Sequence, residues 1–134
     1  MNCVFADTSF YVALANPRDV RHRAAVDAGD RWNGPVMTTE YVLVELGNYL
    51  RGPSGRKVFV DLVQTLGEDA QTTVIPASAV LFGQGFRLYA ARLDKGWSLT
   101  DCISSTVMES HGIIEALAYD HHFEQADFRA LLLR

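Results

Sequence analysis

The sequence predicts an α/β fold, a three-layer α/β/α sandwich built on a central parallel sheet. Short apolar segments of strand length alternate along the chain with longer segments whose apolar residues recur at helical spacing. Parallel strands need long crossover connections, which are usually helical and almost always right-handed. With 134 residues, 49% of them hydrophobic, the chain can build one sizeable core, so we expect a single domain over residues 1–134.

The first half of the chain is expected to supply two strands and four helices. The apolar run 3–6 predicts a buried strand, and Thr8 or Ser9 after it opens a short helix that reaches Ala15. Breaks between the later elements are marked by the pairs Asn16-Pro17, Gly34-Pro35 and Gly52-Pro53. The elements between them are a helix at about 19–28, a strand at 36–38, a helix at about 40–50 that Thr39 can cap, and a helix around 58–66.

The second half is expected to add three strands and two helices. Residues 72–75 predict a strand, and 79–93 a long helix whose first half is weakened by Gly83 and Gly85, at roughly 1 kcal/mol each. Ser98 and Asp101 fit a capping box, which predicts a helix at 99–111. The remaining elements are a strand at 113–118, a turn at 122–126 and an edge strand at 128–133.

Composition narrows the classes of function. The formal net charge of −4 argues against a protein that holds nucleic acid mainly through a strongly basic surface, so any such contact must be local. Cys3 and Cys102 are too few for a disulfide framework and lack the spacing of a structural zinc site, which indicates a reduced, cytoplasmic setting. No signal-peptide pattern or bilayer-length apolar segment is present, so we expect neither export by a signal nor a membrane span.

Two candidate site residues follow apolar strands directly. Asp7 comes after the first predicted strand and Asp120 after the fourth. In open parallel sheets, ligands bind in the crevice outside the carboxyl ends of the strands. Either aspartate alone could equally be a turn residue or a helix cap, but together they predict two carboxylates at one rim of the sheet.

Glu45 is a third candidate, because its predicted helix is apolar on all sides and is therefore expected to be buried. A buried carboxylate needs a partner, and no Lys or Arg lies three or four residues away along the helix. The cation must come from elsewhere, either a bound ion or an arginine distant in sequence. Asn48 could line the same pocket.

Asp101 is the fourth candidate, although its capping box alone explains an acidic residue at this place. A capping role and a role as a site residue can coexist. Four carboxylates at one rim would repel one another unless a cation lay among them, and oxygen ligands suit a hard divalent ion. The implied cofactor is Mg²⁺ or Mn²⁺.

Other chemistries find no support. The four histidines and two cysteines do not form a zinc-ligand spacing, and His121-His122 is expected to be solvated. The sequence has no Gly-rich phosphate loop with its lysine, no dinucleotide fingerprint and no serine nucleophile flanked by glycines.

The order of these motifs resembles the PIN-domain nucleases, specifically the VapC-like toxins of toxin-antitoxin pairs, over nearly the whole chain. The sequence departs from the family pattern at Ala118, where relatives often carry Thr or Ser. The matching pieces are Asp7-Thr8-Ser9, Arg18-Asp19 with His22 and Ala24-Ala25, Thr38-Thr39-Glu40-Tyr41-Val42-Leu43 leading to Glu45, Leu99-Thr100-Asp101-Cys102, and Asp120 with His122-Phe123 and Phe128.

The resemblance implies an endoribonuclease. In that interpretation Asp7, Glu45, Asp101 and Asp120 hold one or two Mg²⁺ or Mn²⁺ ions that activate water for in-line attack on an RNA phosphodiester. Thr8 and Ser9 position water or a carboxylate, and local cations can contact the phosphate backbone. These cations are Arg18, Arg21, Arg23 and Lys95. The resemblance also implies a cognate antitoxin and a homodimer.

Two alternatives stay open. A PIN-like module that has lost cleavage could still bind RNA or protein, although the intact acidic quartet argues against it. A phosphohydrolase that uses Mg²⁺ and a strand-end aspartate nucleophile would usually show a second aspartate two residues later, where this chain has Ser9.

Overall fold

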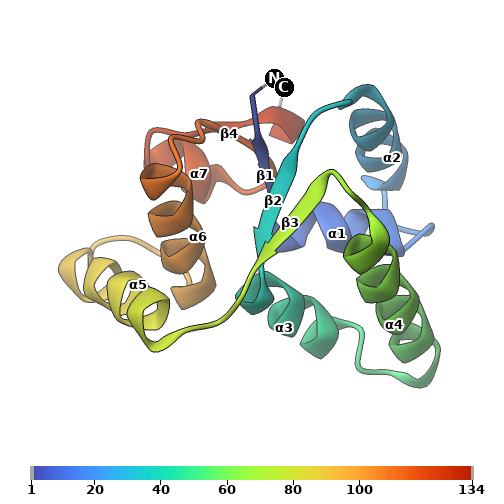
Figure 1. The fold of residues 1–134 in the computed structure, drawn as a ribbon, viewed down its shortest axis with the longest axis horizontal. Coiled ribbons are helices and arrows are strands. Elements are labelled where there is room, and N and C mark those ends of the chain that lie inside the picture. The colour runs from blue at the N-terminus through green and yellow to red at the C-terminus, as the bar shows by residue number, and fades with distance from the viewer. Residues whose placement is uncertain (1, 134) are drawn as a thin grey trace.

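Five parallel strands form the central sheet, in the order β3-β2-β1-β4-β5 (Figure 1). The computed structural model describes residues 2–133. Strand β1 is central, and its Phe5 aligns with Met37 of β2 and Ala116 of β4. The strands are β1 (Val4–Ala6), β2 (Val36–Thr39), β3 (Thr72–Ile75), β4 (Glu115–Leu117) and β5 (Arg129–Ala130).

Helices cover both faces of this sheet, which confirms the three-layer α/β/α prediction. Figure 1 shows α5, α6 and α7 on one side of the strands and α1, α2 and α4 on the other. The helices are α1 (Thr8–Ala15), α2 (His22–Arg31), α3 (Glu40–Tyr49), α4 (Pro53–Glu68), α5 (Ala79–Ala91), α6 (Leu99–Ser110) and α7 (His121–Gln125). None of the helices within residues 2–133 combines the length and apolar character that crossing a bilayer requires.

Polar side chains define where several helices begin. Thr39 accepts a hydrogen bond from the backbone N–H of Val42 at the start of α3, and Ser78 does the same for Leu81 at the start of α5. Such caps satisfy backbone donors that have no partner inside the helix. Pro53 occupies the first turn of α4, where a missing N–H costs nothing. Local sequence therefore sets these boundaries.

The core lies between β1 and the helices on either side of it. Val4, Phe5 and Ala6 of β1 are fully buried, and Phe10 of α1 packs into the same cluster. Gly85 lets α5 approach α6 closely, since a Cβ atom at this position would overlap Ile103. The glycine that weakens α5 as an isolated helix is thus required by its packing.

The structure corrects several predicted boundaries. Helix α2 begins at His22 rather than near 19, because the side chains of Asn16 and Asp19 accept hydrogen bonds from backbone N–H groups two residues later and hold this segment in turns. The predicted turn at 122–126 is the short helix α7. The predicted edge strand at 128–133 pairs only at Arg129–Ala130 and continues as the 3₁₀ turn Leu131–Leu133.

Candidate active site

All four predicted carboxylates line one cavity of about 410 Å³ at the carboxyl ends of β1 and β4. Asp7 follows β1 directly, Asp120 follows β4, Asp101 lies in the first turn of α6 and Glu45 lies on α3. Segments more than a hundred residues apart thus meet at one rim. The lining residues are Asp7, Thr8, Ser9, Val12, Asp19, Arg21, Glu45, Tyr49, Ser98, Asp101, Asp120 and His122.

Asp7 is the most deeply buried of the four, with 3% of its surface exposed. Ser9 holds its carboxylate through two hydrogen bonds to Oδ2, one from the backbone N–H (3.1 Å) and one from the hydroxyl (2.7 Å). The Ser9 hydroxyl oxygen in turn accepts a hydrogen bond from the backbone N–H of Tyr119, at 3.1 Å. Ser9 therefore fixes Asp7 and ties the start of α1 to the segment after β4.

Burial raises the pKa of Asp7 from 3.8 to about 7. The hydrogen bonds from Ser9 oppose this rise, while the negative charge of Asp101 adds to it. Within residues 2–133, no Lys or Arg forms an ion pair with Asp7. A carboxylate that is buried without a cationic side chain is one that a bound cation would stabilise strongly.

Asp101 forms the predicted capping box and also lines the acidic cavity. Its Oδ2 atom accepts a hydrogen bond from the backbone N–H of Ser98 at 3.0 Å, while the Ser98 hydroxyl accepts one from the backbone N–H of Asp101, so the capping box is complete. The same buried carboxylate lines the acidic cavity. Capping thus orients Asp101 toward the site.

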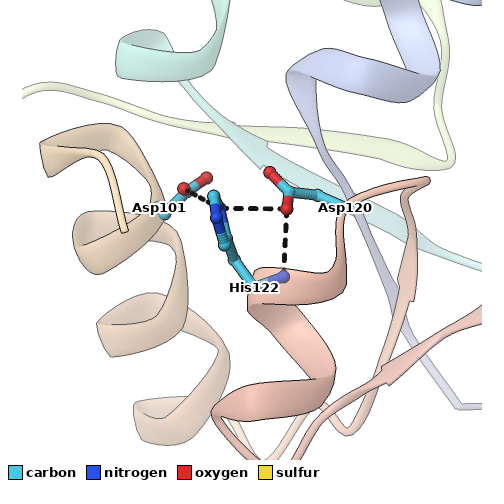
Figure 2. Close-up of side chains that lie close together, drawn as sticks. All are labelled: Asp101, Asp120 and His122. Carbon is cyan, nitrogen blue, oxygen red and sulfur yellow. Dashed lines mark hydrogen bonds and ion pairs between the residues drawn. The ribbon is translucent and has the colours of Figure 1, made fainter. Parts of the chain in front are cut away.

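His122 is the residue that the sequence interpretation missed. It was expected to be solvated, but its Nδ1 atom lies 2.9 Å from Oδ2 of Asp101 and 2.9 Å from Oδ1 of Asp120 (Figure 2). Asp120 caps α7 by accepting a hydrogen bond from the backbone N–H of His122 at 3.0 Å. The sequence signal that could have identified this contact is a histidine two residues after a strand-end aspartate. The aspartate caps the next helix by accepting a hydrogen bond from the histidine N–H, and this holds the histidine beside the site. His121 is exposed, as predicted.

Glu45 lies at the cavity but is only partly buried, which corrects the expectation of a buried helix. Val44 and Tyr49 on the same helix are 61% and 58% exposed, so α3 is apolar without being enclosed. The arginine partner considered for Glu45 is not found among residues 2–133. Asn48 is exposed and lines a separate groove beside α4, so the structure does not bring it to the acidic cavity.

One arginine lines the acidic cavity. The guanidinium of Arg21 lies 4.7 Å from the centre of the Tyr119 ring, and the Tyr119 hydroxyl donates a hydrogen bond to the Arg21 carbonyl at 2.9 Å. The other three cations considered for RNA contact do not line this cavity. Arg18 is exposed, Arg23 pairs with Asp27, and Lys95 lies over Trp97.

The residues present fit a divalent cation. Five carboxylates line the cavity, the four predicted ones and Asp19, against the one guanidinium of Arg21, which leaves an excess of negative charge. Asp101, Asp120 and His122 each offer a ligand atom, and these atoms all lie within 4.8 Å of one another. The buried Thr8 hydroxyl beside Asp7 has no hydrogen-bond partner among the described residues. Carboxylate oxygens in such a cluster suit hard cations such as Mg²⁺ and Mn²⁺.

Comparison with known proteins agrees with this geometry. The PIN domain family model matches residues 4–129, so the chain belongs to the PIN-domain family. Within the family it is similar to VapC20 of Mycobacterium tuberculosis, named as a 23S rRNA-specific endonuclease in strains CDC 1551 / Oshkosh and H37Rv. Identity is 30% over 125 residues, which cover 93% of this chain and 95% of VapC20. The predicted VapC-like resemblance is therefore confirmed.

Solved structures give the same result for the fold. The crystal structure of Mycobacterium tuberculosis VapC20, described as a sarcin-ricin loop cleaving toxin, matches with a TM-score of 0.85 over 93% of this chain and 95% of that one. FitAcB from Neisseria gonorrhoeae matches with a TM-score of 0.64 over 95% of each chain. At 18% identity, this second match concerns the fold alone.

Proposed function

We propose that this chain is a metal-dependent endoribonuclease that cuts a structured ribosomal RNA, and that it is the toxin of a toxin-antitoxin pair. The observation that carries the proposal is the gathering of the four predicted carboxylates and Asp19 in one cavity without enough cationic side chains to balance them. The 23S rRNA specificity of VapC20 makes this RNA the first substrate to test.

In this proposal Asp7, Glu45, Asp101 and Asp120 hold one or two Mg²⁺ or Mn²⁺ ions. When bound, such an ion acts as a Lewis acid that activates water and stabilises negative charge on the phosphate. The protein side chains provide the geometry. Ser9 fixes the orientation of the Asp7 carboxylate and Ser98 that of Asp101, which prepares oxygen ligands in place before the cation arrives.

Arg21 is proposed to bind a phosphate of the RNA next to the reacting bond. Its guanidinium lies over the Tyr119 ring and forms no ion pair with another described residue. Stacking on an aromatic ring leaves the N–H groups at the guanidinium edge able to bind phosphate oxygens. This single local cation is consistent with a chain whose net charge is −4.

Two apolar surfaces support the proposed protein partners, a cognate antitoxin and a second copy of the chain. Five large apolar side chains are exposed on or just after α5, and an apolar groove of about 680 Å³ lies between α3 and α4. Exposed apolar patches commonly mark protein interfaces. The side chains at α5 are Val80, Phe82, Phe86, Tyr89 and Leu93. Free Cys3 and Cys102 agree with the proposed cytoplasmic setting.

The test is cleavage of 23S rRNA, and of a short RNA with the sarcin-ricin loop sequence, by the full chain purified without an antitoxin. Reactions contain Mg²⁺, Mn²⁺ or a chelator. Asp101→Asn is the inactive variant, since an amide oxygen can still cap α6, and Asp94→Asn is the matched control, since Asp94 is exposed and pairs with Arg92.

We expect metal-dependent cuts by the wild-type chain and Asp94→Asn, and none by Asp101→Asn. Cuts elsewhere in 23S rRNA but not in the loop would keep the nuclease and overturn the loop as target. Folded protein that binds RNA but cuts nothing in any metal would favour the inactive binding module.

A further inference from the structure

The Nδ1 atom of His122 lies between two carboxylates that come from different parts of the fold. It is 2.9 Å from Oδ2 of Asp101 in the first turn of α6 and 2.9 Å from Oδ1 of Asp120 at the start of α7 (Figure 2). The backbone N–H of His122 also donates to Asp120, which fixes the start of this short helix. The imidazole is therefore held at the acidic cavity by the same residue that caps its helix.

The Nδ1 atom of His122 cannot satisfy both contacts fully. It carries at most one proton, yet two carboxylates face it at equal distance. A cation that replaced this proton could contact the nitrogen and both carboxylates. Around a six-coordinate ion with metal–ligand distances of about 2.1 Å, adjacent ligand atoms lie about 3.0 Å apart. The two Nδ1–oxygen separations of 2.9 Å are close to this value, and the three candidate ligand atoms all lie within 4.8 Å of one another.

The surroundings of this group point to a cation independently of His122. Asp7 lines the same cavity, is 3% exposed and has no Lys or Arg partner among the described residues. The Thr8 hydroxyl beside it is buried and lacks a hydrogen-bond partner within residues 2–133. The cavity thus contains a buried hydroxyl without a hydrogen-bond partner and a buried carboxylate without a cationic partner among the described residues.

We propose that His122 is a protein ligand of the divalent cation, together with Asp101 and Asp120, and that its nitrogen makes the cavity prefer Mn²⁺ to Mg²⁺. This inference rests on the proposed function, because it concerns the cation that the nuclease would use. Imidazole suits first-row transition metals, whereas sites that contain only oxygen ligands suit Mg²⁺ and Ca²⁺.

The deciding measurement is pulsed electron paramagnetic resonance of Mn²⁺ added to the full chain without RNA, which detects a directly coordinated nitrogen through its magnetic coupling. His122→Asn removes the imidazole, and His121→Asn is the matched control, because its side chain is adjacent and exposed. Mn²⁺ and Mg²⁺ affinities of the three proteins are measured by titration, with circular dichroism to check folding.

We expect nitrogen coupling in the wild-type chain and His121→Asn and its loss in His122→Asn. The Mn²⁺ affinity of His122→Asn should fall about 10-fold or more, with a smaller fall for Mg²⁺. Mn²⁺ bound to the wild-type chain without nitrogen coupling would overturn this inference alone, whether or not His122→Asn folds. Equal losses for both ions would reduce His122 to a residue that positions the carboxylates. If the folded wild-type chain binds no Mn²⁺ or Mg²⁺, the metal-dependent function fails as well.

Discussion

The segments that follow β1 and β4 use the same local device in different surroundings. Each places an aspartate after a strand, and each aspartate caps the next helix by accepting a hydrogen bond from the N–H two residues later, on Ser9 and on His122. Asp7 follows the central strand and is 3% exposed, whereas the Asp120 side chain, nearer the β5 edge, is 30% exposed. Capping is local, but burial depends on the position of the strand in the sheet.

This difference in burial gives the site two kinds of carboxylate, one buried at Asp7 and one partly exposed at Asp120. The neighbour that holds the Asp7 carboxylate is Ser9 on its own helix, and burial raises the pKa of Asp7 to about 7. Asp120 shares a histidine with Asp101 of α6 and so belongs to a contact between two elements. We therefore expect loss of the buried Asp7 charge to weaken cation binding more than loss of the partly exposed Asp120 charge.

The largest expected effect is that of Asp7→Asn on cleavage. The amide can keep the hydrogen bond from the Ser9 N–H but removes the most buried negative charge in the cavity. Cleavage of RNA should fall by at least roughly 10²–10³-fold, measured as single-turnover rates in Mn²⁺, with an unchanged circular dichroism spectrum. Cleavage near the wild-type rate would remove Asp7 from the active site.

The second prediction concerns the stability of the metal-free protein. An aspartate has a pKa of about 3.9 in an unfolded chain, so the folded protein, in which the pKa of Asp7 is about 7, holds this proton more tightly. The resulting contribution to the free energy of unfolding is fully present below about pH 4 and is lost as the pH rises through 7, by on the order of a few kcal/mol.

Urea unfolding in chelator across this pH range measures that loss. In Asp7→Asn the decline should be smaller, because the group that titrates has been removed, and the difference between the two proteins isolates Asp7 from the histidines. Parallel pH profiles for the two proteins would show that Asp7 ionises normally in the folded state.

A smaller loss of cleavage is expected for Asp120→Asn. Its side chain is partly exposed, and an amide oxygen can still accept the hydrogen bond from the His122 N–H. We expect a fall of about 10–100-fold under the conditions used for Asp7→Asn. A loss as large as that of Asp7→Asn would show that the two strand ends contribute equally and that burial does not rank them.

The smallest expected effect is that of Arg21, which lies outside the group of carboxylates, on the binding of RNA. Arg21→Gln should weaken binding of uncut RNA in chelator, and the slope of log affinity against log salt should decrease by about 1 as one phosphate contact is lost. Fluorescence anisotropy measures this change, and Arg23→Gln is the control, because Arg23 pairs with Asp27 on α2. Identical salt slopes for the two variants would contradict a phosphate contact by Arg21.

Much of the fold was predictable because its signals are local. Alternation of apolar strands with amphipathic helices predicted the parallel sheet, and the capping box at Ser98 predicted where α6 begins. The C-terminal edge was predicted poorly, since the mostly apolar segment 128–133 does not distinguish a strand from a 3₁₀ turn. The burial of Glu45 was overestimated because the apolar residues around it, such as Val44, are exposed on the surface.

The sequence by itself determined most of the elements, the caps at Thr39 and Ser98, and the residue types that could form an acidic site. These depend on hydrogen bonds and periodicities that span only a few residues. The tertiary structure decided which side chains meet. Ser9 reaches Tyr119 across 110 positions, and His122 reaches Asp101 across 21. The order of the strands and the packing of α6 and α7 create these contacts, and the degree of burial that they produce sets the electrostatics of each carboxylate.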